Sequence, residues 1–465
     1  MAQSPDCVLV LDLGTSSCKG ALYTRRGERL ATEAIEYPLH TPAPHFVEQD
    51  PEDYVRAAAE IHRRLRSRGH TIRAIGFSTQ TPTLVFVDSE GRAIGPAIIW
   101  QDSRAAEQAS WLASIPPDTR QAWFGMDLPV SAASTPAKLL WVKQNNAALW
   151  RETRWVMQPK DYVASVMTGR MATDRWCAKG IANLDSGEMH PDWMAALGKQ
   201  RSICPPVHSM GFVTGSSDGV PVTAGWSDAM AAILATGAMH SGNRGFVLTG
   251  TSEIAGVSRH GSAAPRGLYY VPPEVMEVPD LSLHYGPTQA GGSCLTWIAA
   301  ILGRSVEETL ALLPSRVSLS PILFRPYLRG ERAPYWDHTL TASFEGLRAE
   351  HTAADLVHAV LQGVALHERL VIETAEQGRG VAHVVLAGGA ARNAFWNQLR
   401  ADILQRPLRI MNDTEASLRG AAMLAWGGEA DWSEWFAAET LAPDATHRET
   451  AADLYRRFPL HTSGH

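Results

Sequence analysis

The sequence lacks the features that mark several large classes of protein. Its five cysteines are scattered and never spaced as C-x-x-C, which argues against both a disulfide framework and a zinc site. The formal net charge is −6 and no run of lysine or arginine occurs, so we expect no nucleic-acid-binding surface. No apolar stretch is long enough to span a bilayer, and no basic region precedes an apolar one at the N-terminus. We therefore expect a cytoplasmic protein with reduced cysteines, no membrane segment and no signal peptide.

Two common nucleotide-binding motifs are also missing. The chain contains neither G-x-G-x-x-G nor G-x-x-x-x-G-K-[ST], so a Rossmann dehydrogenase is set aside. With 465 residues and an ordinary share of apolar side chains, the chain is long enough for two large domains.

The first candidate ligand site follows an apolar run at residues 8–11, which predicts a buried strand ending in Asp12. The turn that follows contains Gly14, Thr15, Ser16 and Lys19. Backbone amides in such a turn can converge on an anion, and the lysine adds a cation. An acid beside that anion makes sense if a divalent metal lies between them. An ordinary strand, turn and strand is the alternative interpretation.

The same pattern returns half a chain later. Leu-Gly-Thr-Ser at residues 13–16 matches Thr-Gly-Thr-Ser at 249–252, and each lies between two apolar strands. Two such hairpins predict a duplicated fold in which Gly250 and Thr251 form a second phosphate loop. We place the domain boundary near residue 240, beside a Ser-Gly-Asn turn, which divides the chain into residues 1–240 and 241–465.

Two segments of the first half suggest a polyol pocket. Gln80 and Thr81 lie in a polar break between two strands, where ligands gather in α/β sheets. Trp100, Asp102 and Arg104 alternate, so on a strand they would share one face. Sugar C–H faces stack on aromatic rings while hydroxyls need charged partners. A polar sheet edge and a buried Asp–Arg pair remain alternatives.

Asp228 begins an alanine-rich helix after a strand that ends in Gly225. An acid there is often only a helix cap, but the small residues around it leave room for a ligand. Residues 383–393 read as a buried strand, a diglycine turn and the start of a helix, where a base and ribose can lie against bare backbone.

In this order the segments resemble the FGGY family of carbohydrate kinases, within the actin, Hsp70 and sugar kinase superfamily. The resemblance runs from residue 8 to about 426, and its most specific motifs are P-Y-L-R-G-E-R-A-P-Y-W-D at 326–337 and A-G-G-A-A-R-N at 387–393. It implies an α/β fold of two ribonuclease-H-like, actin-like ATPase domains with a central ligand cleft. The N-terminal domain would lie on the sugar side and the C-terminal domain would hold the adenosine site.

The resemblance also implies a role for each candidate residue, with ATP and Mg²⁺ as cofactors. Asp228 would accept the proton of the attacking sugar hydroxyl, and Asp12 would organise the metal. Phosphate-loop positions are Gly14, Thr15, Ser16, Lys19, Gly250 and Thr251. Nucleotide-contacting turns contain Gly292, Gly388, Gly389 and Asn393. Sugar-contacting positions are Gln80, Thr81, Trp100, Asp102, Arg104 and Asp228.

Two departures leave the particular sugar open. Many xylulokinase-like members have Gln-Met-His-Gly where this chain has Gln-Thr-Pro-Thr at 80–83, and Ala229 replaces a frequent Asn, Gln or Thr. Glycerol kinases have an Arg-Glu pair at positions 81 and 82, and its absence here argues against glycerol as the substrate.

We expect an ATP-dependent kinase for a small sugar or polyol, a ketopentose such as xylulose first, with a homodimer as a conceivable assembly. Ribulose, a deoxyketose, gluconate and glycerol are alternative substrates. Two non-kinase alternatives also remain: an Hsp70- or actin-like protein in which ATP drives conformation, and a non-catalytic protein of the same fold that binds nucleotide and sugar.

Overall fold

The computed structural model describes residues 5–127, 130–261, 266–429, 432–436 and 438–460. The chain divides into two compact units. The first consists of Met1–Ala235 and Ser417–Trp435, and the second of Thr236–Ala416 and Phe436–His465. The sequence pattern did not indicate that a segment near the C-terminus belongs to the first unit.

The first unit is built on a seven-stranded sheet in the order β11-β12-β5-β1-β2-β3, with β13 also paired to β5. Its strands are β1 (Asp6–Leu13), β2 (Ser17–Thr24), β3 (Arg29–Glu36), β5 (Thr71–Thr79), β11 (Val213–Ser217), β12 (Val220–Thr223) and β13 (Trp226–Ser227). Strand β1 pairs antiparallel with β2 and parallel with β5. The predicted first hairpin is thereby confirmed.

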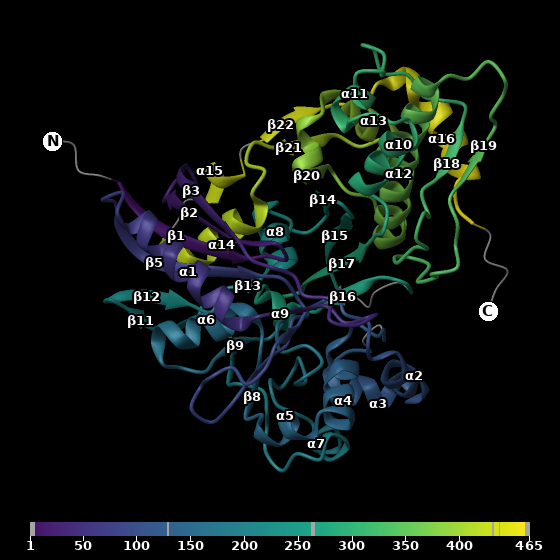
Figure 1. Cartoon of the computed structure of the whole chain (residues 1–465). Helices are drawn as coiled ribbons and strands as arrows, with labels where there is room; N and C mark the ends of the chain where they lie inside the picture. Colours follow the sequence, from purple (N-terminus) through teal and green to yellow (C-terminus); the bar gives the residue numbers. More distant parts are fainter. Residues whose placement is uncertain (1–4, 128–129, 262–265, 430–431, 437, 461–465) are drawn as a thin grey trace. The chain divides into compact units, whose positions relative to one another are not determined.

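The second unit repeats this arrangement in a seven-stranded sheet of order β16-β17-β15-β14-β20-β21-β22. Its strands are β14 (Arg244–Thr249), β15 (Ile254–His260), β16 (Tyr269–Val271), β17 (Leu281–Pro287), β20 (Val384–Gly388), β21 (Leu408–Met411) and β22 (Ala438–Leu441). Strand β14 pairs antiparallel with β15 and parallel with β20, as β1 does with β2 and β5. The predicted duplication of the fold is confirmed, and Figure 1 shows each sheet with its own helices.

Helix α1 (Pro51–Arg66) shows how the sequence specifies an element of the first unit. Asp50 caps it by accepting the N–H of Glu52 at 3.0 Å, and Pro51 occupies the first turn, where no backbone donor is needed. Its buried face includes Ala57, Ile61 and Leu65, which join the core that covers the sheet.

Among the other helices of the first unit, α6 (Pro159–Thr168) packs on this core, and several form a separate group at the bottom of Figure 1. The remaining helices of the unit are α2 (Ala106–Ser114), α3 (Pro117–Phe124), α4 (Thr135–Asn145), α5 (Ala147–Glu152), α7 (Pro191–Leu197), α8 (Asp228–Ala235), α14 (Ala416–Trp426) and α15 (Trp432–Trp435). Short strands complete the unit: β4 (Glu48–Gln49), β6 (Val85–Val87), β7 (Ala97–Ile98), β8 (Trp155–Met157), β9 (Thr173–Asp174) and β10 (Val207–His208).

The second unit is organised around the long helix α12 (Ala353–Glu376). Thr352 and Asp355 form a capping box at its start. The remaining elements are α9 (Pro273–Met276), α10 (Gly292–Ile301), α11 (Val306–Leu310), β18 (Leu323–Arg325), β19 (Ser343–Glu345), η1 (Gly389–Arg392), α13 (Ala394–Leu404), η3 (Ala445–His447) and α16 (Arg448–Arg457).

All five cysteines are free and buried, and Cys7 and Cys18 pack in the core of the first unit. None of the helices among the described residues has the length and apolar character needed to cross a bilayer.

Candidate active site

Asp12 and Asp228 lie near each other because two strands pair with β5 at the same level. Asp12 on β1 stands opposite Ser78, and Trp226 on β13 stands opposite the same Ser78 from the other side. Strand β13 ends at Ser227, so Asp228 is the first residue of α8. The fold therefore brings together the two acids that the sequence proposed for metal binding and proton transfer.

Two serine hydroxyls orient the Asp12 carboxylate. Ser78 Oγ donates to Oδ1 at 2.7 Å, and Ser417 Oγ donates to Oδ2 at 2.8 Å. Ser417 begins the segment near the C-terminus that belongs to the first unit. Neither serine was among the predicted site residues, because nothing local in the sequence links them to Asp12.

The environment of Asp228 suits a general base. Burial and the nearby Asp12 charge raise its pKa to about 7, since both disfavour the ionised carboxylate. One oxygen accepts the N–H of Ala229 at 2.7 Å, which opposes the shift. A carboxylate with a pKa near neutrality takes up a proton more readily than an ordinary aspartate.

The first predicted phosphate turn links β1 to β2. Its backbone closes through a hydrogen bond from Gly14 N to Ser17 O at 3.0 Å. Thr15 is held on both sides: its carbonyl accepts from Gln49 Nε2 at 2.7 Å, and its hydroxyl accepts from Trp100 Nε1 at 2.9 Å. Ser16 at the tip is exposed, and Lys19 stands opposite Asp12 in the β1–β2 ladder.

The predicted sugar segment begins directly after β5. Gln80 is buried, its backbone N–H donates to Leu13 O at 2.9 Å, and its Nε2 donates to Gln49 Oε1 at 2.7 Å. Thr81 follows, half-buried, in a cis peptide with Pro82. Gln80 is thus connected through Gln49 to the turn that contains Thr15.

The expectation that Trp100, Asp102 and Arg104 share a strand face is wrong. Strand β7 ends at Ile98, and residues 100–104 form a turn. The turn forms because Asp102 Oδ1 accepts the backbone N–H of Arg104 at 3.1 Å, which folds the segment back on itself.

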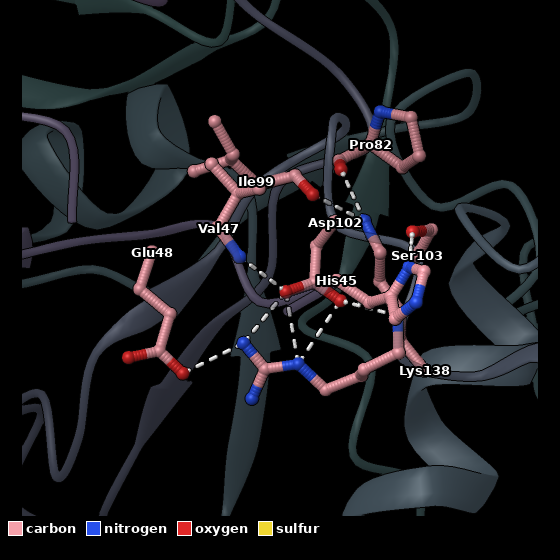
Figure 2. A network of polar contacts seen from close by, with 9 residues as sticks. His45, Val47, Glu48, Pro82, Ile99, Asp102, Ser103 and Lys138 are labelled. Atoms are coloured by element: carbon pink, nitrogen blue, oxygen red, sulfur yellow. Dashed lines mark hydrogen bonds and ion pairs between the residues drawn. The ribbon is translucent and has the colours of Figure 1, made fainter. Parts of the chain in front are cut away.

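Asp102 and Arg104 instead form the buried ion pair that the sequence left as an alternative (Figure 2). The Arg104 guanidinium lies 2.6 Å from Asp102 Oδ2 and 2.7 Å from Glu48 Oε1, and it stacks over the Phe46 ring. Asp102 also accepts the backbone N–H of Val47 at 2.7 Å. The pair therefore binds the segment around residue 47 to the turn after β7.

Lys138, on α4, reaches the same region (Figure 2). Its amine is fully buried and donates to Ile99 O at 2.6 Å and to Pro82 O at 3.2 Å. Burial lowers the pKa of Lys138 to about 7. One lysine thus joins the two segments on which the predicted sugar contacts lie.

In the second unit, parallel pairing of β14 and β20 brings the other predicted loops together. Thr249, the last residue of β14, stands opposite Gly388. Gly388 has a φ of 103°, and a side chain there would collide with Thr249 O, so only glycine fits. Gly292 N donates to Gly250 O at 2.9 Å, and Ser293 N donates to Thr251 O at 2.9 Å. The second predicted phosphate loop, the start of α10 and the diglycine turn are therefore adjacent.

Open space lies beside this turn. Gly389 is exposed, and a Cβ placed on it would meet no atom within 4 Å. Asn393 caps α13 by accepting the N–H of Trp396 at 2.8 Å. It also lines a cavity of about 470 Å³ together with Phe395 on α13 and with Leu313 and Arg316, which follow α11.

Buried charges support the loops of both units, and the sequence did not predict them. Lys160 Nζ lies 2.6 Å from Asp161 and 2.8 Å from Asp174, and donates to Ala224 O at 3.0 Å, four residues before Asp228. In the second unit, Arg400 Nη2 lies 2.8 Å from Glu253 Oε1, directly after the Gly-Thr-Ser loop.

Comparison with known proteins gives the family. Residues 7–235 match the N-terminal domain of the FGGY family of carbohydrate kinases, and residues 245–427 match its C-terminal domain. The chain belongs to this family. It is 30% identical over 442 residues to xylulose kinase of Escherichia coli (strain K12), which covers 89% of this chain and 88% of the relative.

Solved structures agree on the fold. Xylulose kinase from Rhodospirillum rubrum superposes with a TM-score of 0.86 at 25% identity, covering 97% of each chain. Gluconate kinase from Lactobacillus acidophilus gives 0.87 at 22% identity, covering 98% of this chain and 97% of the other. The two-domain actin-like fold is confirmed, and this FGGY kinase is a sugar phosphotransferase that uses ATP.

Proposed function

We propose that this FGGY kinase phosphorylates a ketopentose, with D-xylulose first among them. The observation that supports a transfer to a sugar hydroxyl is the position of Asp228 beside Asp12, with a pKa raised to about 7. The choice of xylulose is supported by the E. coli relative, a xylulose kinase aligned over most of both chains.

In the proposed reaction Asp228 orients the attacking hydroxyl and accepts its proton. The hydroxyl oxygen bonds to the γ-phosphorus of ATP as the bond from that phosphorus to the β–γ bridging oxygen breaks, and ADP leaves. Phosphoryl transfer depends mostly on alignment and charge neutralisation, so proton acceptance comes late. Gln80 and Thr81 are proposed to contact the sugar, and Trp100 to line the pocket that receives it. The ion-paired Asp102 and Arg104 are proposed to shape this pocket.

The residues present fit Mg²⁺. Magnesium in phosphoryl-transfer sites is held by one or two carboxylates together with substrate phosphates. Asp12, oriented by Ser78 and Ser417, supplies such a carboxylate, and Asp228 lies close enough for its pKa to respond. We propose that Asp12 holds Mg²⁺, which when bound neutralises negative charge on the phosphates.

The predicted phosphate and nucleoside contacts of each unit are part of this proposal. Gly14, Thr15, Ser16 and Lys19 in the first unit, and Gly250 and Thr251 in the second, would meet phosphates. Gly292, Gly388, Gly389 and Asn393 would meet the nucleoside. The open space at Gly389 and the cavity beside Asn393 support this assignment.

Gluconate is the second candidate. The segment Gln-Thr-Pro-Thr at 80–83 departs from the Gln-Met-His-Gly of many xylulokinase-like members, and the gluconate kinase from L. acidophilus shares the fold. Purified protein with Mg²⁺ and ATP, screened for ADP release with ketopentoses, deoxyketoses, gluconate and glycerol, separates these substrates. ADP release that no ketopentose raises above the rate without sugar would contradict the proposed ketopentose substrate.

A cytoplasmic location and a homodimer remain proposals. The first is supported by five free, buried cysteines, as expected in a reducing compartment. Sedimentation of the purified protein measures the second.

A further inference from the structure

Gln49 is a fully buried polar side chain that bonds to three different segments of the first unit. Its Nε2 donates to Thr15 O at 2.7 Å. Its Oε1 accepts from Gln80 Nε2 at 2.7 Å and from the Tyr54 hydroxyl at 2.8 Å. One amide group therefore joins the first phosphate turn, the sugar segment and helix α1.

The flanking residues leave Gln49 little freedom. Glu48 pairs with Arg104 at 2.7 Å (Figure 2), and Asp50 caps α1. The backbone at Gln49 itself pairs with Ala97 on β7. Each side chain of the Glu-Gln-Asp run thus has its own partner, and the central one faces the two ligand-binding segments.

The hydrogen bond between Gln49 and Gln80 also orients the Gln80 side chain. Because Gln80 Nε2 donates to Gln49, the other amide atom, Oε1, is turned away as an acceptor. Among the described residues this buried oxygen has no hydrogen-bond partner. A buried acceptor without a partner is costly, and a sugar hydroxyl is a donor that could satisfy it.

We propose that Gln49 is a positioning residue that couples sugar binding at Gln80 to the phosphate turn at Thr15. The proposal rests on the proposed function, in which these two segments bind the sugar and the ATP phosphates. A sugar hydroxyl that donates to Gln80 Oε1 holds the Gln80 amide in one orientation. The fixed amide then orders Gln49, and Gln49 holds the Thr15 carbonyl in place, so that the turn meets ATP already ordered.

The quantity to measure is the coupling between the ligands. Calorimetry gives the Kd of a non-hydrolysable ATP analogue with Mg²⁺, in the absence and presence of saturating sugar, and the ratio is the coupling factor. The sugar is whichever one the wild-type enzyme phosphorylates. We expect Gln49→Met, similar in size but without hydrogen-bonding groups, to lower this factor about tenfold, the usual effect of losing a buried hydrogen-bonded link.

Tyr54→Phe is the matched control. It removes one hydrogen bond to the same Gln49 oxygen but keeps the ring, which packs edge-on against Tyr37 with centroids 5.3 Å apart. We expect a lower Tm with an unchanged coupling factor. If Tyr54→Phe loses as much coupling as Gln49→Met, or if Gln49→Met lowers only Tm, then Gln49 merely fills the core and the proposal is wrong.

Gln49→Glu keeps the test decisive if the methionine variant does not fold. Glutamate still accepts from Tyr54 and Gln80, but it turns an oxygen toward Thr15 O. We expect reduced coupling with a sugar Kd close to that of wild type, and wild-type coupling in this variant would overturn the proposal. Wild-type enzyme that turns over no sugar would instead overturn the proposed function.

Discussion

Asp12 lies one residue before the end of β1 and Asp228 directly follows β13, and these two strands pair with opposite edges of β5, so that the charge of one acid acts on the other. Asp12 and Trp226 both stand opposite Ser78, and Asp228 follows two residues after Trp226. This register explains why a carboxyl at the start of a helix, where the pKa is normally low, has a pKa near 7.

The first prediction concerns Asp228 as the base. Asp228→Asn keeps the shape but removes the proton acceptor, so kcat should fall by about 10²–10⁴-fold while binding of an ATP analogue stays close to wild type. Asp218→Asn is the control, because Asp218 is exposed and pairs only with Arg66 in the described contacts. Near-normal kcat in Asp228→Asn would mean that Asp228 only begins a helix and takes no part in proton transfer.

The second prediction follows from the raised pKa. Only ionised Asp228 can accept a proton, so kcat/KM for the sugar should rise about tenfold per pH unit below pH 7 and level off above it. A profile already flat from pH 5 upward would mean that the carboxyl titrates as an ordinary aspartate. The measurement is initial rate against pH at subsaturating sugar.

The same shift predicts a change in stability. A carboxyl whose pKa is higher in the folded than in the unfolded protein destabilises the fold once it ionises, so stability should fall as pH rises from about 4 through 7. Asp228→Asn removes this cost. Its Tm should therefore exceed the wild-type Tm at pH 8, with a difference that shrinks toward pH 4. An equal Tm difference at both pH values would contradict the shift.

The fourth prediction tests the nucleotide turn with two open glycines. A Cβ at Gly389 or at Gly211 meets no atom within 4 Å, and neither residue has a positive φ. Both Gly389→Val and Gly211→Val should fold normally. Only Gly389→Val should raise KM for ATP, about tenfold or more, because its side chain fills the space proposed for the nucleotide. Equal KM values in the two variants would place the nucleotide elsewhere.

Local patterns in the sequence predicted much of the fold. The repeated Gly-Thr-Ser between apolar strands was enough to predict the duplication, because each hairpin is specified by residues close in sequence. The partners of the site residues could not be predicted in this way. Ser417 reaches Asp12 across some four hundred positions, and Gln49 meets Gln80 through the pairing of separate segments. Hydrophobic periodicity reports which face is buried, not which distant side chain lies opposite.

The sequence also could not decide whether Asp102 and Arg104 bind the sugar or pair with each other. This choice supplies the last prediction. If these residues bound sugar directly, Arg104→Met would raise the sugar KM and leave the fold intact. In the structure the guanidinium is almost completely buried between Asp102 and Glu48, and removing it leaves the buried Asp102 carboxylate and the half-buried Glu48 carboxylate without their cation. Breaking such a pair costs about 3–5 kcal/mol, so the Tm should fall clearly. Arg63→Met is the control, because the Arg63 side chain is largely exposed where it pairs with Glu60 on α1, and its loss should leave the Tm within a degree or two. A normal Tm with a raised sugar KM in Arg104→Met would contradict this structural role and would indicate that Arg104 contacts the sugar directly.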